Sequence, residues 1–114
     1  MSIDAMVRAY FAAYENWDRA AIEQLLADSF TFRSPMDDNI DRATYFERCW
    51  PAAKDDRKFD IKTLMTDGND VMIRYECAWS SGKHHHRCAE YFRTDGRKIT
   101  HVDVYFGFVV PAQS

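Results

Sequence analysis

Long apolar runs are missing from this sequence of 114 residues, and no stretch approaches the roughly 20 apolar residues that a membrane-spanning helix needs. The opening segment, MSIDAMVRAY, also lacks the basic and then apolar order of a secretory signal peptide. We therefore expect a cytoplasmic protein that makes no contact with a membrane.

Concentrated positive charge is missing too. The chain has 15 lysines and arginines against 18 acidic residues, a formal net charge of −3, and its basic residues form no stripe. A surface that binds nucleic acid needs such a stripe or patch. The sequence also has no glycine-rich phosphate loop and no nucleophile elbow. Nucleic-acid binding, phosphate-loop chemistry and hydrolysis by an elbow serine are therefore not expected.

Cysteine is scarce and irregularly spaced, at positions 49, 77 and 88. An odd number of cysteines without zinc-ligand spacing argues against both a disulfide framework and a cysteine-based zinc site. We expect Cys49, Cys77 and Cys88 to be reduced thiols that fill space in the core.

Aromatic residues, by contrast, are abundant: 8 Phe, 6 Tyr and 3 Trp make up 15% of the chain. A pocket lined by rings would account for this excess over the needs of a small core. The other proportions, 46% apolar and 29% charged residues, are those of an ordinary globular protein. A chain of this length has room for one core, so we expect a single domain over residues 1–114.

The hydrophobic pattern predicts three helices in the first half of the chain. Apolar residues recur at helical spacing in each, and a side chain suited to N-capping precedes each one. The predicted helices cover about 3–14, 19–27 and 42–50, and their N-caps are Ser2, Asp18 and Asp41. Residues 29–35 alternate as a short edge strand, and residues 36–41 are expected to form a loop in which Asp37 and Asp38 are solvated.

Four longer strands are predicted in the second half. They cover residues 59–66, 70–80, 83–94 and 98–110, and the turns between them, DGND, SSGK and TDGR, all contain glycine. Strands joined in sequence by short turns pair antiparallel. The fold class is therefore α+β, with three N-terminal helices packed on a curved antiparallel sheet.

The turn at Ser81-Gly82 fixes which residues of its two strands lie opposite each other. A two-residue loop places Tyr75 opposite Cys88 and Ile73 opposite Glu90, on the face that must meet the helices. The same face carries Cys77, Trp79, His84 and His86. Because burying unpaired ionisable groups is costly, this face is expected to enclose a hollow.

In the last strand, Val102, Val104 and Phe106 line the same hollow if a bulge near Gly96 keeps the two faces of the sheet in step. Asp103 then points to the opposite face. The other register, with Asp103 in the hollow, stays open from the sequence.

Glu90 is the strongest candidate acid or base, because a carboxyl group in an apolar cavity has a raised pKa. His86 and His84 could supply a base with a pKa of about 6.5. The alternatives are a structural hydrogen bond for Glu90 and a polar lining role for the histidines. A His-x-His pair with Cys88 or Glu90 could also bind a metal ion, but no second ligand cluster occurs elsewhere in the sequence, so no metal is expected.

Two segments resemble the nuclear-transport-factor-2-like superfamily, in particular its SnoaL-like branch. The segment YFAAYENWDRAAIEQLLADSFTF is similar to the family's succession of helix, Asp-capped helix and strand, and EYFRTDGRKITHVDVYFG is similar to its closing hairpin. The resemblance covers the chain from about Met6 to Phe108. It implies a cystatin-like cone, in which a strongly curved sheet and the helices enclose an internal pocket.

The resemblance carries over to only part of the catalytic set of ketosteroid isomerase-like members. Tyr10 stands at the position of their oxyanion-hole tyrosine. Ser34, before Pro35, stands where they have the general-base aspartate, and Cys88 stands where they have a second oxyanion donor. Other branches place an aspartate where this chain has Val104. The resemblance therefore implies a pocket more strongly than it implies a reaction.

These observations predict a protein that binds a small hydrophobic ligand. As an enzyme it would be a cofactor-independent isomerase, cyclase or lyase that transfers a proton on a carbonyl-bearing substrate, with Glu90 or His86 moving the proton and Tyr10 stabilising negative charge. The further residues expected at the ligand site are Tyr14, Phe32, Ser34, Tyr75, Cys77, Trp79, His84, Cys88, Val102, Val104 and Phe106. The alternative is a non-catalytic ligand-binding or dimerisation module of the same fold.

A homodimer through the outer face of the sheet is also expected, because many members of the superfamily dimerise in this way. Apolar residues interrupt the charges on that face of this sequence. They are Met72, Ala78, Ala89, Tyr91 and Tyr105.

Overall fold

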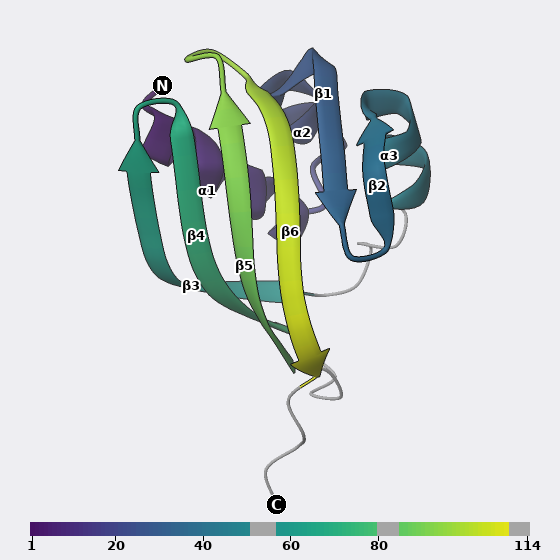
Figure 1. The fold of residues 1–114 in the computed structure, drawn as a ribbon, viewed down its shortest axis with the longest axis vertical. Coiled ribbons are helices and arrows are strands. Elements are labelled where there is room, and N and C mark those ends of the chain that lie inside the picture. The colour runs from purple at the N-terminus through teal and green to yellow at the C-terminus, as the bar shows by residue number, and fades with distance from the viewer. Residues whose placement is uncertain (51–56, 80–84, 110–114) are drawn as a thin grey trace, which may run out of the picture.

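The computed structural model describes residues 1–50, 57–79 and 85–109, apart from the side chains of residues 79 and 106–109. The helices are α1 (Ile3–Glu15), α2 (Arg19–Leu25) and α3 (Arg42–Arg48). The strands are β1 (Leu26–Ser34), β2 (Asp37–Asp41), β3 (Arg57–Asp67), β4 (Asp70–Trp79), β5 (His85–Thr94) and β6 (Ile99–Val109). Figure 1 shows the strands as one curved layer with α1 and α2 behind it and α3 beside β2.

Each helix begins where the sequence predicts, because a polar side chain caps its N-terminus. The Ser2 hydroxyl accepts a hydrogen bond from the backbone N–H of Ala5 at 3.1 Å, and Asp18 and Asp41 accept equivalent bonds at the other two helices. Helix α2 ends earlier than the sequence predicts. Its C-cap Leu26 already has extended backbone angles, φ −95° and ψ 134°, and opens β1.

The six described strands form one sheet in the order β2-β1-β6-β5-β4-β3. The α+β class is confirmed, and the neighbouring strands are antiparallel except β1 and β6, which run parallel. This parallel pair makes the sheet mixed, a feature that the prediction of an antiparallel sheet did not include. Most of the chain separates β1 from β6, so no short turn fixes their relative direction.

The polar segment at 37–41, which the sequence predicts as a loop, forms the edge strand β2. Ser34 makes the turn that precedes it, since its hydroxyl accepts hydrogen bonds from the backbone N–H groups of Met36 and Asp37, both at 3.1 Å. The chain then returns along β1. The segment lacks the alternating apolar residues that usually mark a strand, which explains why the pattern indicated a loop.

The predicted register of β4 and β5 is confirmed. The pairs are Ile73 with Glu90, Tyr75 with Cys88 and Cys77 with His86. On the other side of β5, Glu90 pairs with Val104, and the adjacent Asp103 therefore lies on the outer face. There its carboxylate is 2.9 Å from the Nε2 atom of His101.

A bulge in β6 places Val104, and not Asp103, on the inner face, and this decides the register that the sequence left open. Arg93 pairs with His101, but the next residue of β5, Thr94, pairs with Ile99. Thr100 is thus the extra residue, and its hydroxyl donates a hydrogen bond to the backbone carbonyl of Arg93 at 3.1 Å.

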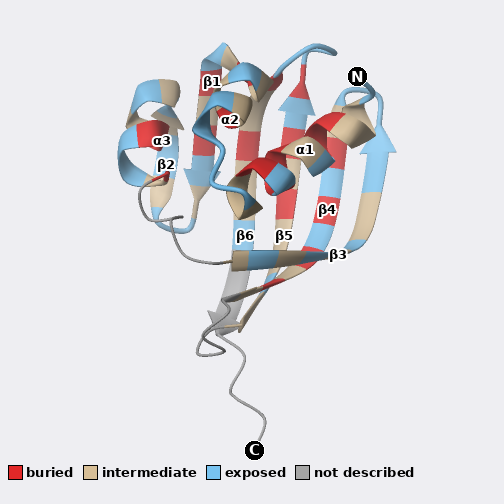
Figure 2. Ribbon diagram, turned by 180° about the vertical axis from the view of Figure 1, so that it is seen from behind, coloured by how far each residue is buried: buried red, intermediate tan, exposed pale blue. Residues whose placement is uncertain are grey.

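Helix α1 packs against the inner face of the sheet, and the buried residues gather where it crosses the strands (Figure 2). At the centre of this contact, the Phe11 ring meets other rings edge-on. Its centroid is 5.1 Å from that of Phe59, 4.9 Å from that of Tyr75 and 5.8 Å from that of Phe92. Edge-to-face pairs of this kind contribute about 0.5–1.5 kcal/mol each beyond the area that they bury. The helix therefore fixes the positions of β3, β4 and β5 relative to one another.

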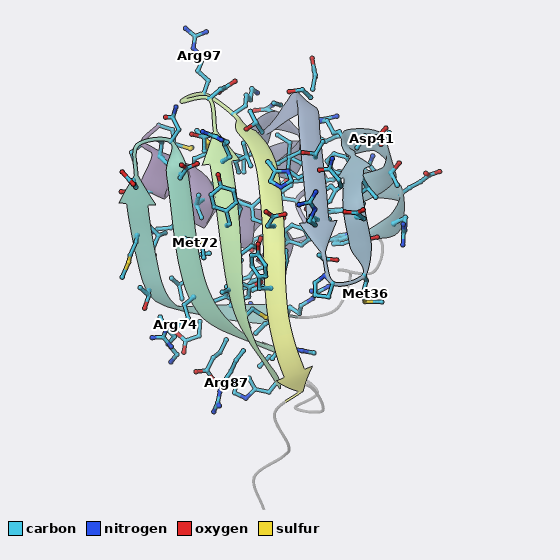
Figure 3. All side chains as sticks on the ribbon, in the orientation of Figure 1. Met36, Asp41, Met72, Arg74, Arg87 and Arg97 are labelled. Atoms are coloured by element: carbon cyan, nitrogen blue, oxygen red, sulfur yellow. The ribbon has the colours of Figure 1, made fainter. Side chains whose placement is uncertain are left out.

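The outer face of the sheet, on the side away from α1, carries exposed apolar side chains. Met72 is 46% exposed and Tyr105 is 57% exposed, and Figure 3 shows Met72 on this face above Arg74 and Arg87. Among the described residues, no helix is long and apolar enough to cross a membrane.

We expect a homodimer that buries this outer face. Replacing both Met72 and Tyr105 with Asp should convert the dimer to a monomer in sedimentation velocity, because two buried charges would face each other across the symmetric interface. Met36→Asp, at the 78% exposed Met36 of the β1–β2 turn, should leave the dimer intact. A wild-type protein that sediments only as a single chain would contradict this expectation.

Candidate functional site

A cavity of about 400 Å³ opens between α1, the end of α3, the β1–β2 turn and the inner face of the sheet. Most of the residues that the sequence predicts for the site line it: Tyr10, Tyr14, Phe32, Ser34, Tyr75, Cys77, His86, Cys88, Glu90 and Val104. The lining also includes residues that the sequence reasoning did not single out for the site. They are Phe11, Met36, Asp37, Arg48, Cys49, Arg57 and Phe59.

The remaining predicted residues are placed differently. Val102 is fully buried in the core and does not line the cavity, since it pairs with Phe92 where α1 covers the sheet. The side chains of Trp79 and Phe106, and the whole of His84, lie outside the described residues.

Glu90 is the buried carboxyl group of the cavity. It projects from the middle of β5 and is only 3% exposed. The Tyr75 hydroxyl on β4 donates a hydrogen bond of 2.6 Å to its Oε1 atom. Burial raises the pKa of Glu90 to about 8, and the hydrogen bond from Tyr75 opposes this rise. The side chain is therefore mostly protonated at neutral pH, yet it can release and regain a proton near that pH.

Three tyrosine hydroxyls meet beside this carboxyl group. The hydroxyl of Tyr45, on α3, lies 2.8 Å from that of Tyr10 and also hydrogen-bonds the hydroxyl of Tyr14, both on α1. Burial is the main cause that raises the pKa of all three tyrosines, and the nearby Glu90 raises them further. All three hydroxyls are therefore protonated at neutral pH and can donate hydrogen bonds.

Tyr45 is the member of this cluster that the sequence reasoning missed. It is fully buried between Phe30 and Phe32, with ring centroids 5.0 Å from each. A tyrosine on the apolar side of a short helix has the pattern of an ordinary core residue. Its hydroxyl bonds to α1 depend on how α3 packs, which the helical spacing alone does not determine.

Replacing Tyr45 with Phe should lower the free energy of unfolding by about 1–3 kcal/mol, because it removes the hydroxyl that joins those of Tyr10 and Tyr14. Urea denaturation at pH 7 measures the change. Tyr91→Phe is the control: it loses a 2.6 Å bond to Asp70 on the outer face and should cost under about 1 kcal/mol. A Tyr45→Phe variant as stable as the wild type would show that the cluster does not stabilise the helix packing.

A second polar group lies at the outer part of the cavity, centred on Asp37. Its carboxylate forms an ion pair of 2.8 Å with the Nη2 atom of Arg48 and accepts hydrogen bonds from the Ser34 hydroxyl at 3.2 Å and from the Cys49 thiol at 3.9 Å. The expectation that Asp37 is solvated is wrong, since its side chain is 11% exposed; Asp38 is 94% exposed as expected. The error follows from the missed strand β2, which turns Asp37 toward α3.

The three cysteines are free thiols, as the sequence predicts, but they line the cavity. Burial raises the pKa of Cys49, Cys77 and Cys88 to about 11. A hydrogen bond from Arg57 opposes this rise at Cys77. At neutral pH the thiols are protonated, so they serve as a soft apolar lining and are poor nucleophiles.

No group of three or more His, Cys, Asp or Glu side chains within residues 1–50, 57–79 and 85–109 is arranged to hold a metal ion. The proposed partner of His86 in a metal site, His84, lies outside these ranges.

The family described as SnoaL-like domain matches residues 7–102. None of the curated proteins compared with this chain matches it. Among solved structures, an NTF2-like protein of unknown function from Cytophaga hutchinsonii ATCC 33406 superposes with a TM-score of 0.76 at 23% identity, covering 94% of this chain and 91% of its own.

Two further similar structures are described by an activity. A candidate ketosteroid isomerase from Kribbella flavida DSM 17836 has a TM-score of 0.81 at 14% identity, with 98% of this chain and 82% of its own covered. An LEH-like epoxide hydrolase from M. tuberculosis has a TM-score of 0.76 at 18% identity, with 92% and 82% covered. Likeness at these identities shows a shared fold and leaves the reaction to be argued from the cavity.

Proposed function

Because the chain belongs to the family of SnoaL-like domains, we propose that its cavity binds a small hydrophobic, carbonyl-bearing molecule and that Glu90 transfers a proton on it. The single observation that carries this proposal is the buried carboxyl group of Glu90 in the wall of the cavity, with a pKa of about 8. A carboxyl group whose pKa lies near the working pH can both give and take a proton during one reaction cycle.

The tyrosines supply the second part of this chemistry. Removing a proton next to a carbonyl group leaves negative charge on the carbonyl oxygen, and hydrogen-bond donors fixed at that oxygen stabilise the charge. Tyr10 and Tyr14 line the cavity, and Tyr45 holds their hydroxyls in place. The arrangement suits an isomerase, cyclase or lyase that works without a cofactor.

Glu90 and Tyr75 form a unit within this mechanism. The hydrogen bond from Tyr75 stabilises the ionised carboxylate, and burial favours the protonated form, so the two effects bring the pKa close to neutrality. Both residues line the cavity, and Tyr75 orients the carboxyl group toward a ligand. His86 lines the same cavity, four residues before Glu90 on β5, and is the second candidate to carry a proton.

The alternative function is a non-catalytic binding module. Ser34 and Val104 favour it. The resemblance to ketosteroid isomerase-like members leads one to expect an aspartate at position 34, and the resemblance to other branches leads one to expect an aspartate at position 104. Ser34 is engaged as the turn residue before β2 and accepts two backbone hydrogen bonds. Val104 faces Glu90 with an apolar side chain. Neither can act as a base.

The experiment that separates the two functions is a panel of ring compounds carrying carbonyl or epoxide groups. Binding is followed by quenching of tryptophan fluorescence, since the stacked pair Trp17 and Trp50 is next to the Tyr14 ring, and turnover is followed by product analysis. Turnover with a kcat/KM that changes around pH 8 supports the proton-transfer function. Binding without turnover on any compound supports the binding module, and no binding at all contradicts both.

A further inference from the structure

A threonine, a histidine and an aspartate are joined by hydrogen bonds on the outer face of the sheet. The Thr31 hydroxyl, on β1, lies 2.6 Å from the Nδ1 atom of His101, on β6, and the Nε2 atom of the same imidazole lies 2.9 Å from the carboxylate of Asp103. Thr31 pairs with His101 in the parallel ladder, and Asp103 follows His101 by two residues on the same face. Because the cavity lies on the inner face, this cluster is separate from Glu90 and its proposed chemistry.

The hydrogen-bond partners decide which nitrogen of His101 carries the proton. An ionised carboxylate can only accept hydrogen bonds, so Asp103 holds the proton of the neutral imidazole on Nε2. Nδ1 then has a free lone pair and accepts a hydrogen bond from the Thr31 hydroxyl. A nucleophile bonded to a base, with the base oriented by a third group, is the arrangement that activates a hydroxyl group for covalent chemistry.

The cluster is sheltered but open to small reagents. The side chains of His101 and Asp103 are 20% and 15% exposed, and Thr31 is partly buried. The ring of Tyr91, on β5, lies beside the imidazole, with centroids 6.5 Å apart. The described helices lie behind the sheet or beside β2, so they leave this side of β1 and β6 uncovered (Figure 1).

Arg33 supplies positive charge on the same face. It follows Thr31 by two residues on β1 and pairs with Asp103 in the ladder. Its guanidinium group is 52% exposed and forms an ion pair of 3.3 Å with Asp38, which is 94% exposed. Exposed ion pairs of this kind are weak, so the guanidinium group can also turn toward a nearby anion. A positive group beside a nucleophile stabilises the negative charge that acyl transfer places on the carbonyl oxygen.

We propose that Thr31 is an acyl-acceptor site, at which its hydroxyl attacks a small activated ester while His101 takes up the proton and Asp103 positions the imidazole. The bond between Oγ1 and the acyl carbon forms as the bond from that carbon to the leaving oxygen breaks. The electron pair of the broken bond leaves with the phenolate or alkoxide, and the hydroxyl proton passes to Nδ1 of His101. Asp103 is a positioning residue, because it acts only through the imidazole.

The test treats the protein with p-nitrophenyl acetate at pH 7, follows the release of p-nitrophenolate, and locates the acetyl groups by peptide mass spectrometry. Thr63 is the control within the same molecule. It is also partly buried on the outer face, but its hydroxyl accepts hydrogen bonds from the guanidinium group of Arg74. Acetylation of Thr31 is expected to be about 10²-fold or more faster than that of Thr63, which is the usual gain from a general base.

Variants assign the reaction to its residues. His101→Gln removes the base and should slow acetylation of Thr31 by about 10²-fold or more. Asp103→Asn should also slow it, because the Asn amide can donate to Nε2 and so favours the imidazole with its proton on Nδ1. Thr31→Ser keeps a hydroxyl at this position and should retain the reaction. An unchanged rate at Thr63 shows that each variant keeps the fold of the sheet.

Three outcomes overturn the proposal. Acetylation of Thr31 no faster than that of Thr63 would show that its hydroxyl is not activated. An unchanged rate at Thr31 in the His101→Gln variant would show that the histidine does not act as its base. Fast release of p-nitrophenolate that persists in a Thr31→Val variant would show that another group receives the acetyl. None of these outcomes affects the proposed proton transfer by Glu90, which lies on the other face of the sheet.

Discussion

Replacing Glu90 with Gln is expected to lower kcat by about 10²–10⁴-fold on any substrate that the wild-type protein converts, which is the usual contribution of a general acid or base. Gln has nearly the same shape as Glu, and its amide oxygen can accept the hydrogen bond that Tyr75 donates to Glu90 at 2.6 Å. It cannot take up or release a proton near neutral pH. The change therefore removes the proposed chemistry and keeps the packing.

The measurement is kcat and KM for wild type and variant under the same conditions, with binding of an unreactive ligand as a test of the cavity. Glu76→Gln is the control, because Glu76 lies on the outer face, where its carboxylate is 2.7 Å from the Nε2 atom of His85. It should leave kcat unchanged. Wild-type turnover by the Glu90→Gln variant would remove Glu90 from the mechanism and leave His86 as the candidate.

The stability of the wild-type protein is expected to fall as the pH rises from about 5 to about 8. The pKa of Glu90 is about 8 in the folded protein and 4.5 in its ordinary state. Between these values the folded state binds more protons than the unfolded state, so each rise in pH favours unfolding. A shift of one pKa unit corresponds to about 1.4 kcal/mol, which gives a loss of roughly 3–5 kcal/mol in the free energy of unfolding.

At lower pH, the stability is expected to fall as the pH decreases. Hydrogen bonds from backbone N–H groups lower the pKa of Asp41, which caps α3, and of Asp95, in the β5–β6 turn. The stability that these two exposed carboxylates contribute is present above their ordinary pKa and is lost as the pH falls through the lowered value. We therefore expect maximum stability on the acidic side of neutrality.

Urea denaturation of wild type and Glu90→Gln at pH 5 and pH 8 measures this effect. The Gln variant should be similar to the wild type at pH 5 and more stable than it at pH 8, because it has no proton to lose. This result would also show that the protein retains an unfavourable buried carboxyl group, as sites of function often do. Equal stability of the wild type at the two pH values would show that Glu90 is not buried as described.

The register of the central strands was predictable because two local signals agree there. A two-residue turn predicted at Ser81-Gly82, which lies outside the described residues, sets the pairing, and side-chain alternation assigns each residue to a face. The position of Glu90 opposite Ile73 therefore follows from the sequence. The sequence shows that β6 needs one extra residue if its apolar side chains are to lie on the same face as those of β5. It does not show that this residue is Thr100. Both inferences rest on contacts between strands that are neighbours in the sequence.

The outer part of the site was not predictable in the same way. Asp37 reaches the cavity because β2 pairs at the edge of the sheet and faces α3. Tyr45 reaches the tyrosine hydroxyls of α1 because α3 packs against β1 and β2. The parallel pairing of β1 and β6 likewise depends on how the whole chain closes. Polar residues in short elements carry weak periodicity, so their partners depend on tertiary packing that the sequence pattern does not encode.

The bulge at Thr100 decides which of two adjacent residues of β6 lies opposite Glu90. Deleting Thr100 itself would leave the pairing of the other residues unchanged. Inserting one residue into the β5–β6 turn, with the bulge kept, would instead exchange the two faces of β6, because side chains alternate with a period of two. Asp103 would then replace Val104 across from Glu90, and a lone buried acid would become a pair of carboxyl groups. A single insertion at this turn would therefore add a carboxyl group to the pocket, and it would also shift the pairing of β6 with β1 by one residue.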